Sequence, residues 1–517
     1  MKKYSRWIMI PPAVLFLALS TAWADVRMPN IFGDSMVLQR GIPLPVWGMA
    51  DPGEKVTVTL GGKSFSTVTG KDGRWMVRLK KMDAGGPYEM KITGNNSLSF
   101  KDVLVGEVWV CSGQSNMWWR IGLMKGIEQE IASADYPNIR YFSTNLVSTE
   151  EPQFDFPGNK PQWKACSPAV IKDFSAVAYY FGKAIHQDIG VPVGLVHTSW
   201  GGSVAEAWTR IEALKSKREL RPLVENLDGV KTAYPEAKAK YDRNYAEFQK
   251  AQSKGTIVDM PLAPRNPNER DWPSGLYNAM LAPMIPYGIR GVIWYQGESN
   301  AVRAWQYRVL FPTLIKDWRS AWKQGDFPFI YVQLANWKTA TIPVEGTWGS
   351  WPELREAQLM TLSLPKTGMA VTVDIGDSTN IHPNNKWDVG SRLALSALHV
   401  AYGRDIVYSG PIYRSMKKDG NNIRLRFDHA DGGFTARNGE SLRGFTIAGK
   451  DKVFHPANAR ISGTEVIVSS DSVTNPVAVR YGWEDNPTCN LYNLAGLPAS
   501  PFRTDSWRGI TEGKINP

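Results

Sequence analysis

Cysteine is scarce in this chain, with only three in 517 residues, at positions 111, 166 and 489. At most one disulfide can form, which excludes a disulfide framework as the basis of the fold. No zinc-type ligand spacing is present either, and Asp374 with Asp377 is too sparse a pair to hold a metal ion. We therefore expect a fold held by its hydrophobic core, with no metal and no organic cofactor.

Long apolar runs are also missing after the N-terminus, so no transmembrane segment is predicted. The one apolar run, from Trp7 to Leu19, is too short to span a bilayer stably. It follows three cationic residues and precedes the small residues of Ala22-Trp-Ala24. This order is typical of a secretory signal peptide. We expect residues 1–24 to be removed and the mature chain to be periplasmic or secreted.

Charge of one sign is not clustered anywhere in the sequence. Lys and Arg number 60 against 49 Asp and Glu, for a formal net charge of +11, but the cations are scattered. Nucleic-acid binding usually requires a basic patch, so it is unsupported, although a basic exported protein can be drawn to acidic surfaces or glycans. The 43% of hydrophobic and 21% of charged residues are typical of a folded enzyme.

The length of 517 residues exceeds what one hydrophobic core usually serves, so two or three domains are expected. Short β-type runs between turn residues predict a β-sandwich over residues 25–102. Strands then alternate with helices over residues 103–404, which indicates a mostly parallel sheet covered on both faces. Residues 405–517 form a second β region, and its aromatic, proline-rich end is expected to pack back as a strap. The β regions could bind polysaccharide or serve as packing and spacing modules.

A Lys-, Ala- and Glu-rich stretch at about 211–255 interrupts the central region and predicts a helical insertion. Tyr241, Tyr245 and Phe248 follow each other at intervals of four and three, so they share one helix face. We weigh two roles for this insertion, a solvated structural helix and a substrate lid.

The apolar, β-branched run from Val103 to Val110 stops at Ser112-Gly113 and delivers Ser115 into a turn. We interpret it as a buried strand whose carboxyl end meets a helix N-terminus, where open α/β sheets bind their ligands. There a serine gains from backbone N–H donors and from the helix dipole, which makes Ser115 a candidate nucleophile. The alternative is a helix-capping serine in a polar turn.

Three later stretches repeat the pattern of a strand that ends in a polar turn. Together with the first they resemble the SGNH hydrolases and, within them, the sialate O-acetylesterase family of carbohydrate esterases. The resemblance spans about residues 103–401 and implies a flavodoxin-like, three-layer α/β fold. The motifs that carry it are Gly113-Gln-Ser-Asn116, Ser199-Trp-Gly-Gly-Ser203, Tyr295-Gln-Gly-Glu-Ser-Asn300 and Ile381-His-Pro-Asn-Asn-Lys386, followed by Gly390-Ser-Arg-Leu393.

The resemblance implies that Ser115 is the nucleophile and His382 the general base. It also implies an oxyanion hole made by the N–H groups of Ser115 and Gly202 and by the side chain of Gln296. A tetrahedral oxyanion is stabilised by about three such donors.

Many SGNH enzymes place an orientating Asp three residues before the histidine, but here that position is Thr379. We favour Asp377 for this role and consider Asp374 next. A backbone carbonyl and a Ser–His dyad are the third possibility.

Candidate sugar contacts adjoin these turns. Indole rings pack well against pyranose C–H faces, so Trp118 and Trp200 are candidates, as are the neighbouring Trp119 and Trp294. We add two polar groups of the third motif, Glu298 and Asn300, with a structural role in the loop as the alternative for Glu298. His197, within a strand, is expected to be a buried core residue rather than a catalyst.

We therefore expect an exported serine esterase that removes O-acetyl groups from carbohydrates through an acetyl-enzyme. Sialate 9-O-acetyl esters are the first substrate hypothesis, and acetylated xylan or xyloglucan the second. A non-catalytic carbohydrate-binding protein is the alternative from another class. The sequence does not indicate an oligomeric state.

Overall fold

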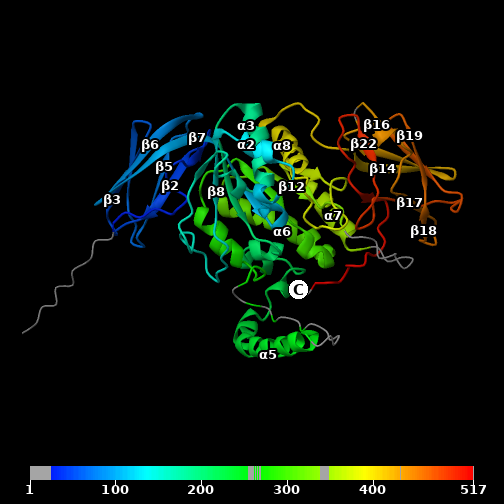
Figure 1. Ribbon diagram of the computed structural model, residues 1–517, viewed down its shortest axis with the longest axis horizontal. Helices are drawn as coiled ribbons and strands as arrows, with labels where there is room; N and C mark the ends of the chain where they lie inside the picture. The colour runs from blue at the N-terminus through cyan, green and yellow to red at the C-terminus, as the bar shows by residue number, and fades with distance from the viewer. Residues whose placement is uncertain are drawn as a thin grey trace, which may run out of the picture.

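The computed structural model describes residues 25–253, 261, 264, 266, 269–337, 349–430 and 432–515. The expected signal peptide, residues 1–24, lies outside the described residues. Three regions follow one another along the longest axis of the molecule (Figure 1). A β region coloured blue lies at one end, an α/β region occupies the centre and an orange to red β region lies at the other end.

The central sheet has the strand order β13-β12-β11-β7-β10-β8-β9. All its neighbouring pairs are parallel except β8 with the edge strand β9, so the sheet is mixed. In a flavodoxin-type order the second strand lies beside the first, whereas here β10 separates β8 from β7. The strands are β7 (Ser97–Gly113), β8 (Tyr136–Ser143), β9 (Lys164–Cys166), β10 (Val193–Ser199), β11 (Gly291–Tyr295), β12 (Phe329–Gln333) and β13 (Thr367–Val371).

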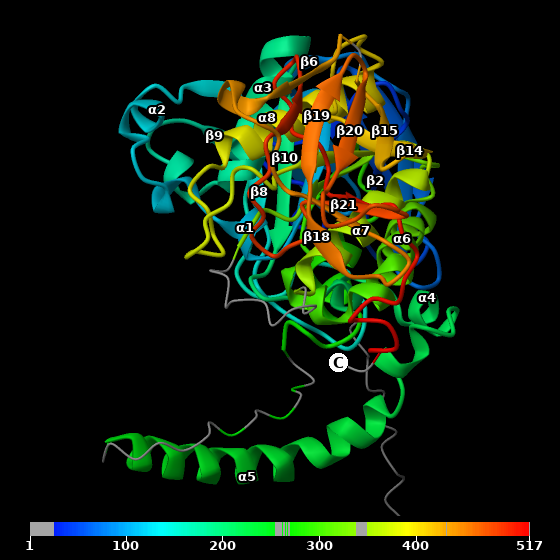
Figure 2. The same cartoon turned by 90° about the vertical axis from the view of Figure 1, so that its right-hand side faces the viewer.

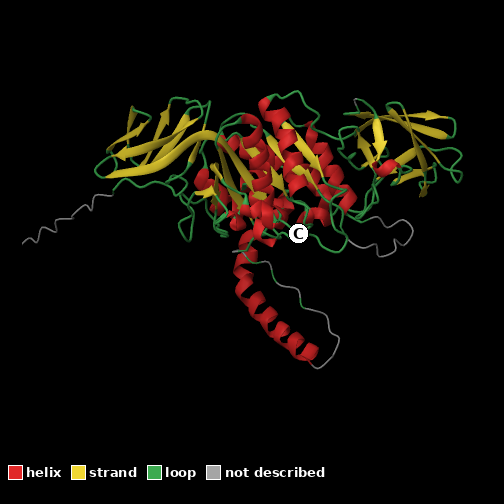
Figure 3. Ribbon diagram, turned by 45° about the horizontal axis from the view of Figure 1, so that its top comes forward, coloured by secondary structure: helices red, strands yellow, loops and turns green. Residues whose placement is uncertain are grey.

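Helices cover both faces of this sheet (Figure 3). Trp109 of β7 packs against α3 and α8, through Phe181 and Tyr402. Trp294 of β11 faces the other way and stacks on Phe311 of α6. The main helices are α3 (Ala176–Ile189), α6 (Ala304–Trp322), α7 (Trp351–Met360) and α8 (Trp387–Tyr402). The prediction of a three-layer α/β fold with flanking β regions is therefore confirmed.

Strand β7 is seventeen residues long and belongs to two regions at once. Its first half pairs with β6 of the N-terminal region, and its second half lies in the central sheet. The boundary expected between residues 102 and 103 therefore falls inside one continuous strand. The other N-terminal strands are β1 (Val37–Gln39), β2 (Leu44–Met49), β3 (Lys55–Leu60), β4 (Lys63–Val68), β5 (Arg74–Leu79) and β6 (Gly85–Thr93).

The C-terminal β region has a hydrophobic core of its own, separate from that of the rest of the chain. Its last segment returns to α7, where Arg503 pairs with Glu356 at 2.7 Å and Thr511 bonds to Glu353. The strands are β14 (Ile412–Asp419), β15 (Asn422–Asp428), β16 (Phe434–Ala436), β17 (Phe445–Ala448), β18 (Phe454–Pro456), β19 (Asn458–Ser462), β20 (Glu465–Ser469), β21 (Ala478–Tyr481), β22 (Leu491–Asn493) and β23 (Phe502–Arg503).

The expected insertion contains two helices, the short α4 (Ile211–Lys215) and the long α5 (Leu227–Ser253). Helix α5 has no buried residue and stands below the body of the molecule (Figure 2). Tyr245 stacks between Tyr241 and Phe248, with ring centroids 5.6 and 5.9 Å apart. The expected aromatic face is therefore present. Two short helices, α1 (Ser115–Trp118) and α2 (Glu128–Ala132), precede β8.

No helix in the described part of the chain is both long enough and apolar enough to cross a membrane. The three cysteines are all free, and Cys111 is completely buried in β7.

Candidate active site

Three of the predicted turns meet because their strands are neighbours. β7 lies between β10 and β11, and Gly113 at its end is in register with both Ser199 and Tyr295. Gly113 has a φ of 139°, and a side chain there would clash with the carbonyl oxygen of Tyr295. Only glycine permits this close approach. The carboxyl ends of these strands therefore bring Ser115 beside the glycines that follow β10 and the turn that follows β11.

Ser115 is the first residue of α1 and is half-buried. Gly201 lies so close that a side chain on it would begin 3.3 Å from the Ser115 Cβ. Among the described residues, neither the N–H of Ser115 nor that of Gly202 has a hydrogen-bond acceptor. Two unpaired backbone donors in the nucleophile turn and the adjacent glycine turn are the parts of an oxyanion hole.

His382 lies in a loop that follows β13, the strand at one edge of the sheet. Strand β13 is three strands from β7, a separation of about 14 Å. The side chain of Asn116 holds this loop at the nucleophile, because its Nδ2 donates to the carbonyl of Ile381 at 3.0 Å. Trp119 stacks on the imidazole, with ring centroids 4.9 Å apart and 15° between the planes. The structure therefore brings the Ser115 and His382 segments together, although the two side chains do not hydrogen-bond to each other.

The imidazole of His382 has one buried nitrogen, Nε2, without a hydrogen-bond partner in the described part of the chain. Burial lowers the pKa of His382, and the positive charge of Lys386 lowers it further. The ring is therefore neutral near pH 7, as a general base requires.

Neither of the two candidate aspartates reaches this ring. The Asp377 carboxylate accepts from the N–H and the hydroxyl of Thr379, both at 2.8 Å, and from the N–H of Asn380 at 3.2 Å. It closes its own turn, as aspartates commonly do. Asp374 is buried in an ion pair with Arg392, at 2.6 and 2.8 Å. The structure therefore does not support the expectation that one of these carboxylates orientates His382.

Gln296 is completely buried, and its amide group is fully engaged. Its Nε2 donates to the carbonyl of Ser203 at 3.2 Å and to Asn300 Oδ1 at 2.6 Å, and its Oε1 accepts from Tyr307. A primary amide has only two N–H groups. In this structure Gln296 therefore has no N–H left for an oxyanion, contrary to the role that the resemblance implied.

Gln114, one residue before the nucleophile, has the opposite arrangement. Its Oε1 accepts from the N–H groups of Gly297 and Ser299, at 3.3 and 3.4 Å. Because both neighbours are N–H donors, the atom that they contact must be the amide oxygen of Gln114 and not its nitrogen. Among the described residues the Nε2 of Gln114 has no acceptor. It is therefore a free side-chain donor next to Ser115.

Asn300 is 1% exposed and belongs to the loop rather than to a substrate surface. Its Oδ1 accepts from the N–H of Ala205 at 2.9 Å, and its Nδ2 donates to Glu206 at 2.9 Å. The structure therefore does not support the expected sugar contact through Asn300, because both ends of its amide are already bonded within the protein.

Glu298 takes part in a buried polar network under the nucleophile helix. Asn116 Nδ2 donates to Glu298 Oε1 at 2.6 Å, while Lys386 Nζ donates to Asn116 Oδ1 at 2.6 Å. The second carboxylate oxygen of Glu298 is buried without a partner among the described residues, so the acid does not face a substrate. Of its two weighed roles, the structure favours the structural one.

Burial dominates the electrostatics of this network. It raises the pKa of Glu298, although the bond from Asn116 opposes the change. It lowers the pKa of Lys386 from 10.5 to about 7, against the attraction of Glu298. Because Asn116 bridges the two ionisable groups and also bonds Ile381, the network ties the nucleophile helix, the turn after β11 and the His382 loop together.

The tryptophans divide into accessible and buried rings. Trp118 and Trp200 are half-buried and remain able to contact a ligand. Trp294 is fully buried and packs edge-on against Trp208, so the expectation that it contacts sugar is wrong. His197 is buried between Ser143 and Ser199, at 3.0 and 2.7 Å, which confirms it as a core residue.

The sequence did not predict a role for three residues of this site, Asn116, Gln114 and Lys386. All three lie inside the quoted motifs, and this position was the one indication in the sequence that they belong to the site. Their roles depend on side chains that lie 183 and 270 positions apart in the chain, and no local pattern encodes such a pairing.

Comparisons with known proteins agree with this geometry. The family model of carbohydrate esterases described as sialic acid-specific acetylesterase matches residues 247–399. A sialate O-acetylesterase of Mus musculus is 30% identical, with 95% of this chain and 96% of that protein covered. The chain belongs to the sialate O-acetylesterase family. The human sialate O-acetylesterase is 28% identical over 95% of this chain and 96% of its own length.

The solved structure of a carbohydrate acetylesterase from Xanthomonas citri has a TM-score of 0.80 and 39% identity, and the match covers 93% of this chain and 100% of that one. This sialate O-acetylesterase family member is therefore a carboxylic ester hydrolase. The prediction of an enzyme is confirmed over the alternative of a non-catalytic binding protein.

Proposed function

We propose that this family member removes O-acetyl groups from carbohydrates through an acetyl-enzyme on Ser115. Ser115 Oγ attacks the acetyl carbonyl carbon while His382 takes the hydroxyl proton. The carbon–oxygen bond to the sugar then breaks, and His382 returns the proton to the departing sugar oxygen. Water, activated by His382, attacks the acetyl group and releases acetate and free Ser115.

The observation that carries this proposal is the position of Ser115 at a helix N-terminus, with its own N–H and that of Gly202 unpaired among the described residues. Both donors can bond the oxyanion that forms during the attack, and each such bond contributes several kcal/mol where water is excluded. The pairing of Asn116 with Ile381 brings the base to the same place.

We further propose that His382 acts without an orientating carboxylate. Trp119 stacks on the ring and limits its rotation, and Nε2 stays free for proton transfer. This arrangement corresponds to a Ser–His pair whose histidine is positioned by packing.

The substrate is proposed to be an O-acetylated sugar. The Mus musculus relative is named a sialate O-acetylesterase, and the Xanthomonas citri structure is that of a carbohydrate acetylesterase. A panel of 9-O-acetylated sialic acid, acetylated xylan and acetylated xyloglucan, with acetate release as the readout, separates the candidates. Release from none of the three would contradict the proposal.

The acetyl-enzyme is tested by mass spectrometry after rapid acid quenching with an aryl acetate. We expect one added acetyl group on the peptide that contains Ser115, and none in Ser115→Ala. The exposed Ser133→Ala serves as the matched control and should be acetylated on Ser115 like the wild type. An acetyl group on another residue would remove Ser115 from the mechanism.

We also propose that the chain is exported after cleavage before Asp25, and that it comprises the β region 25–102, the esterase region 103–404 and the β region 405–517. N-terminal sequencing of the protein recovered from the periplasm or the medium tests the cleavage. A mature protein that begins at Met1 would contradict it.

A further inference from the structure

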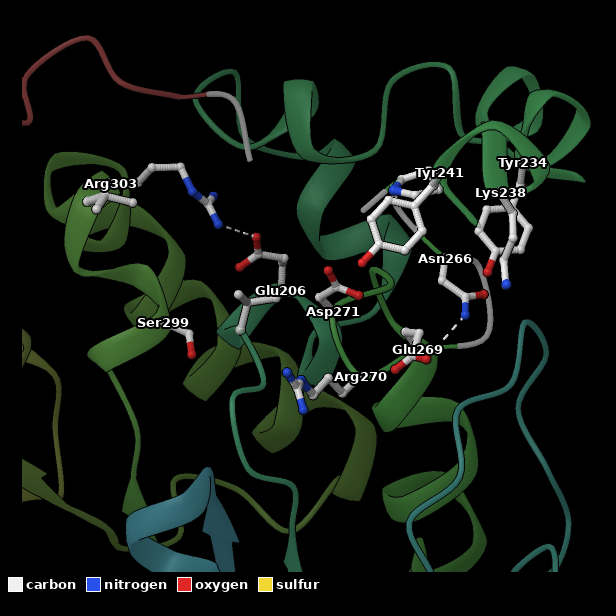
Figure 4. Close-up of a pocket in the computed structure, with 13 residues that line it drawn as sticks. Glu206, Tyr234, Lys238, Tyr241, Asn266, Glu269, Arg270, Asp271, Ser299 and Arg303 are labelled. Atoms are coloured by element: carbon white, nitrogen blue, oxygen red, sulfur yellow. Dashed lines mark hydrogen bonds and ion pairs between the residues drawn. The ribbon is translucent and has the colours of Figure 1, made fainter. Parts of the chain in front are cut away.

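A cavity of about 600 Å³ lies between the insertion and the esterase region (Figure 4). Tyr234 and Tyr241 enter it from α5, while Ser299 and Arg303 lie on the opposite side. The described residues Pro264, Asn266, Glu269, Arg270 and Asp271 also line it. Its volume is in the range of cavities that hold ligands larger than an acetyl group.

Two residues that line the cavity lie next to the turns around the nucleophile. Ser299 lines it, and the N–H of Ser299 bonds to the side chain of Gln114, which precedes Ser115. Arg270 also lines it, and a side chain on Gly202 would begin 3.0 Å from the Arg270 guanidinium. The cavity therefore adjoins the turns that surround Ser115, so a sugar chain whose acetyl group lies at Ser115 has this cavity beside it.

Charge in the cavity is balanced rather than of one sign. Its described walls hold three cationic and three acidic side chains, namely Lys238, Arg270, Arg303, Glu206, Glu269 and Asp271. Arg303 pairs with Glu206 at 2.6 Å, and Lys238 pairs with Asp242 at 2.7 Å. The cavity therefore presents many hydrogen-bonding groups without a net field that would select a charged ligand.

The two tyrosines lie seven residues apart, which is about two helical turns, so both rings project from one face of α5. An aromatic ring offers a flat apolar face, and hydrogen-bonding side chains surround it here. Sugar rings match this combination because they have apolar C–H faces and hydroxyl groups at their edges.

Resting on the proposed function, we infer that this cavity is a second subsite, which binds the neutral sugar residues next to the acetylated one in an oligosaccharide chain. Tyr241 packs on a sugar ring, and the charged side chains bond its hydroxyls. The preferred substrate is then a chain of several sugars rather than a single acetylated sugar.

The kinetic test compares acetylated xylo-oligosaccharides and xyloglucan oligosaccharides of increasing length with an aryl acetate. For the wild type, kcat/KM should rise with chain length. Tyr241→Ala should lower the ratio of the long-chain to the aryl acetate kcat/KM by about tenfold, as expected for one lost ring contact. Tyr241→Phe keeps the ring and should keep most of the ratio.

Two further variants separate the cavity from the helix that bears it. Val302 lines the cavity and is 61% exposed, so Val302→Trp fills the space without disturbing the core and should also lower the ratio. Phe248 lies on the same helix outside the cavity, and Phe248→Ala should leave the ratio at the wild-type value. An equal loss in Phe248→Ala would overturn the assignment to this cavity.

A binding measurement keeps the subsite testable even if the esterase proposal fails. Unacetylated xylo-oligosaccharides and xyloglucan oligosaccharides are titrated into Ser115→Ala and into Ser115→Ala with Tyr241→Ala, by calorimetry. Binding about tenfold weaker in the double variant supports the subsite whatever the catalytic result. Absence of binding, or equal binding by both proteins, would overturn it, and so would equal turnover of single and chain substrates.

Discussion

The Ser115 turn and the His382 loop reach the same site in different ways. Ser115 follows a central strand, and its position is set by backbone packing around Gly113. His382 follows the edge strand β13 and is held by side chains, through Asn116 and the stacked Trp119. A position set by the backbone is robust to most substitutions nearby, whereas one set by side chains depends on a few named contacts.

The largest expected effect comes from removing the base itself. His382→Ala leaves the packed turn around Ser115 intact but removes the proton acceptor, so kcat should fall about 10⁴-fold, by analogy with other serine hydrolases. Turnover of an aryl acetate is the measurement, with unfolding by circular dichroism as the control for structure. The half-buried histidine should cost little stability. A loss below about tenfold would mean that another group is the base.

The second effect contrasts the two glutamines of the site. Among the described residues the amide N–H groups of Gln114 have no acceptor, whereas both N–H groups of Gln296 are bonded within the protein. We expect Gln114→Ala to lower kcat by about 10²-fold with little change in KM, as for one lost oxyanion donor. Gln296→Ala should mainly lower the unfolding temperature, because it leaves buried partners unpaired. The reverse pattern would restore Gln296 as the donor.

A third effect concerns the cation under the His382 loop. Lys386 lowers the pKa of His382, and only the neutral imidazole is a base. In Lys386→Met the pKa of His382 should rise towards its ordinary value. Activity is then lost at a higher pH as the solution is acidified, so the acidic limb of kcat/KM should move upward.

Burial is the larger cause of the lowered His382 pKa, so the movement should be smaller than one pH unit. The exposed Lys172→Met is the matched control and should leave the pH profile unchanged. A downward movement of the limb in Lys386→Met would contradict the assignment.

Sequence patterns predicted the parts of the molecule that backbone geometry determines. Apolar runs that end in glycine turns identified the strand ends, and adjacency in a parallel sheet then places Ser115 beside Gly202. The same patterns could not reveal that β7 continues from one region into the next. Its first six residues alternate between exposed and partly buried positions, whereas the rest are all buried, so the one strand resembles two shorter runs.

The sequence patterns could not predict which side chains form hydrogen bonds with each other. Gln296 and Asn300 lie in a motif with Glu298, yet they bond to each other, to Tyr307 and to the glycine-turn segment after β10 rather than to a ligand. Polar groups that packing has buried must find partners, and the nearest partner depends on the three-dimensional neighbours rather than on the spacing along the chain.

The smallest effect should come from Asp377, the residue predicted from the sequence to orientate His382 because Thr379 occupies the usual position. Among the described residues its carboxylate has hydrogen bonds to Thr379 and Asn380 alone, within its own turn. In Asp377→Asn the side-chain oxygen remains as an acceptor for the same N–H groups, so the turn is kept. We expect kcat within about threefold of the wild type, whereas loss of a triad aspartate lowers it about 10⁴-fold.

Asp374→Asn is the informative counterpart, because it breaks a buried ion pair with Arg392. It should destabilise the fold by about 3 kcal/mol while the folded molecules retain activity. Both variants are measured with one aryl acetate after folding is checked by circular dichroism. A collapse of kcat in a fully folded Asp377→Asn protein would mean that the His382 loop rearranges on substrate binding, and that the histidine is positioned by a carboxylate after all.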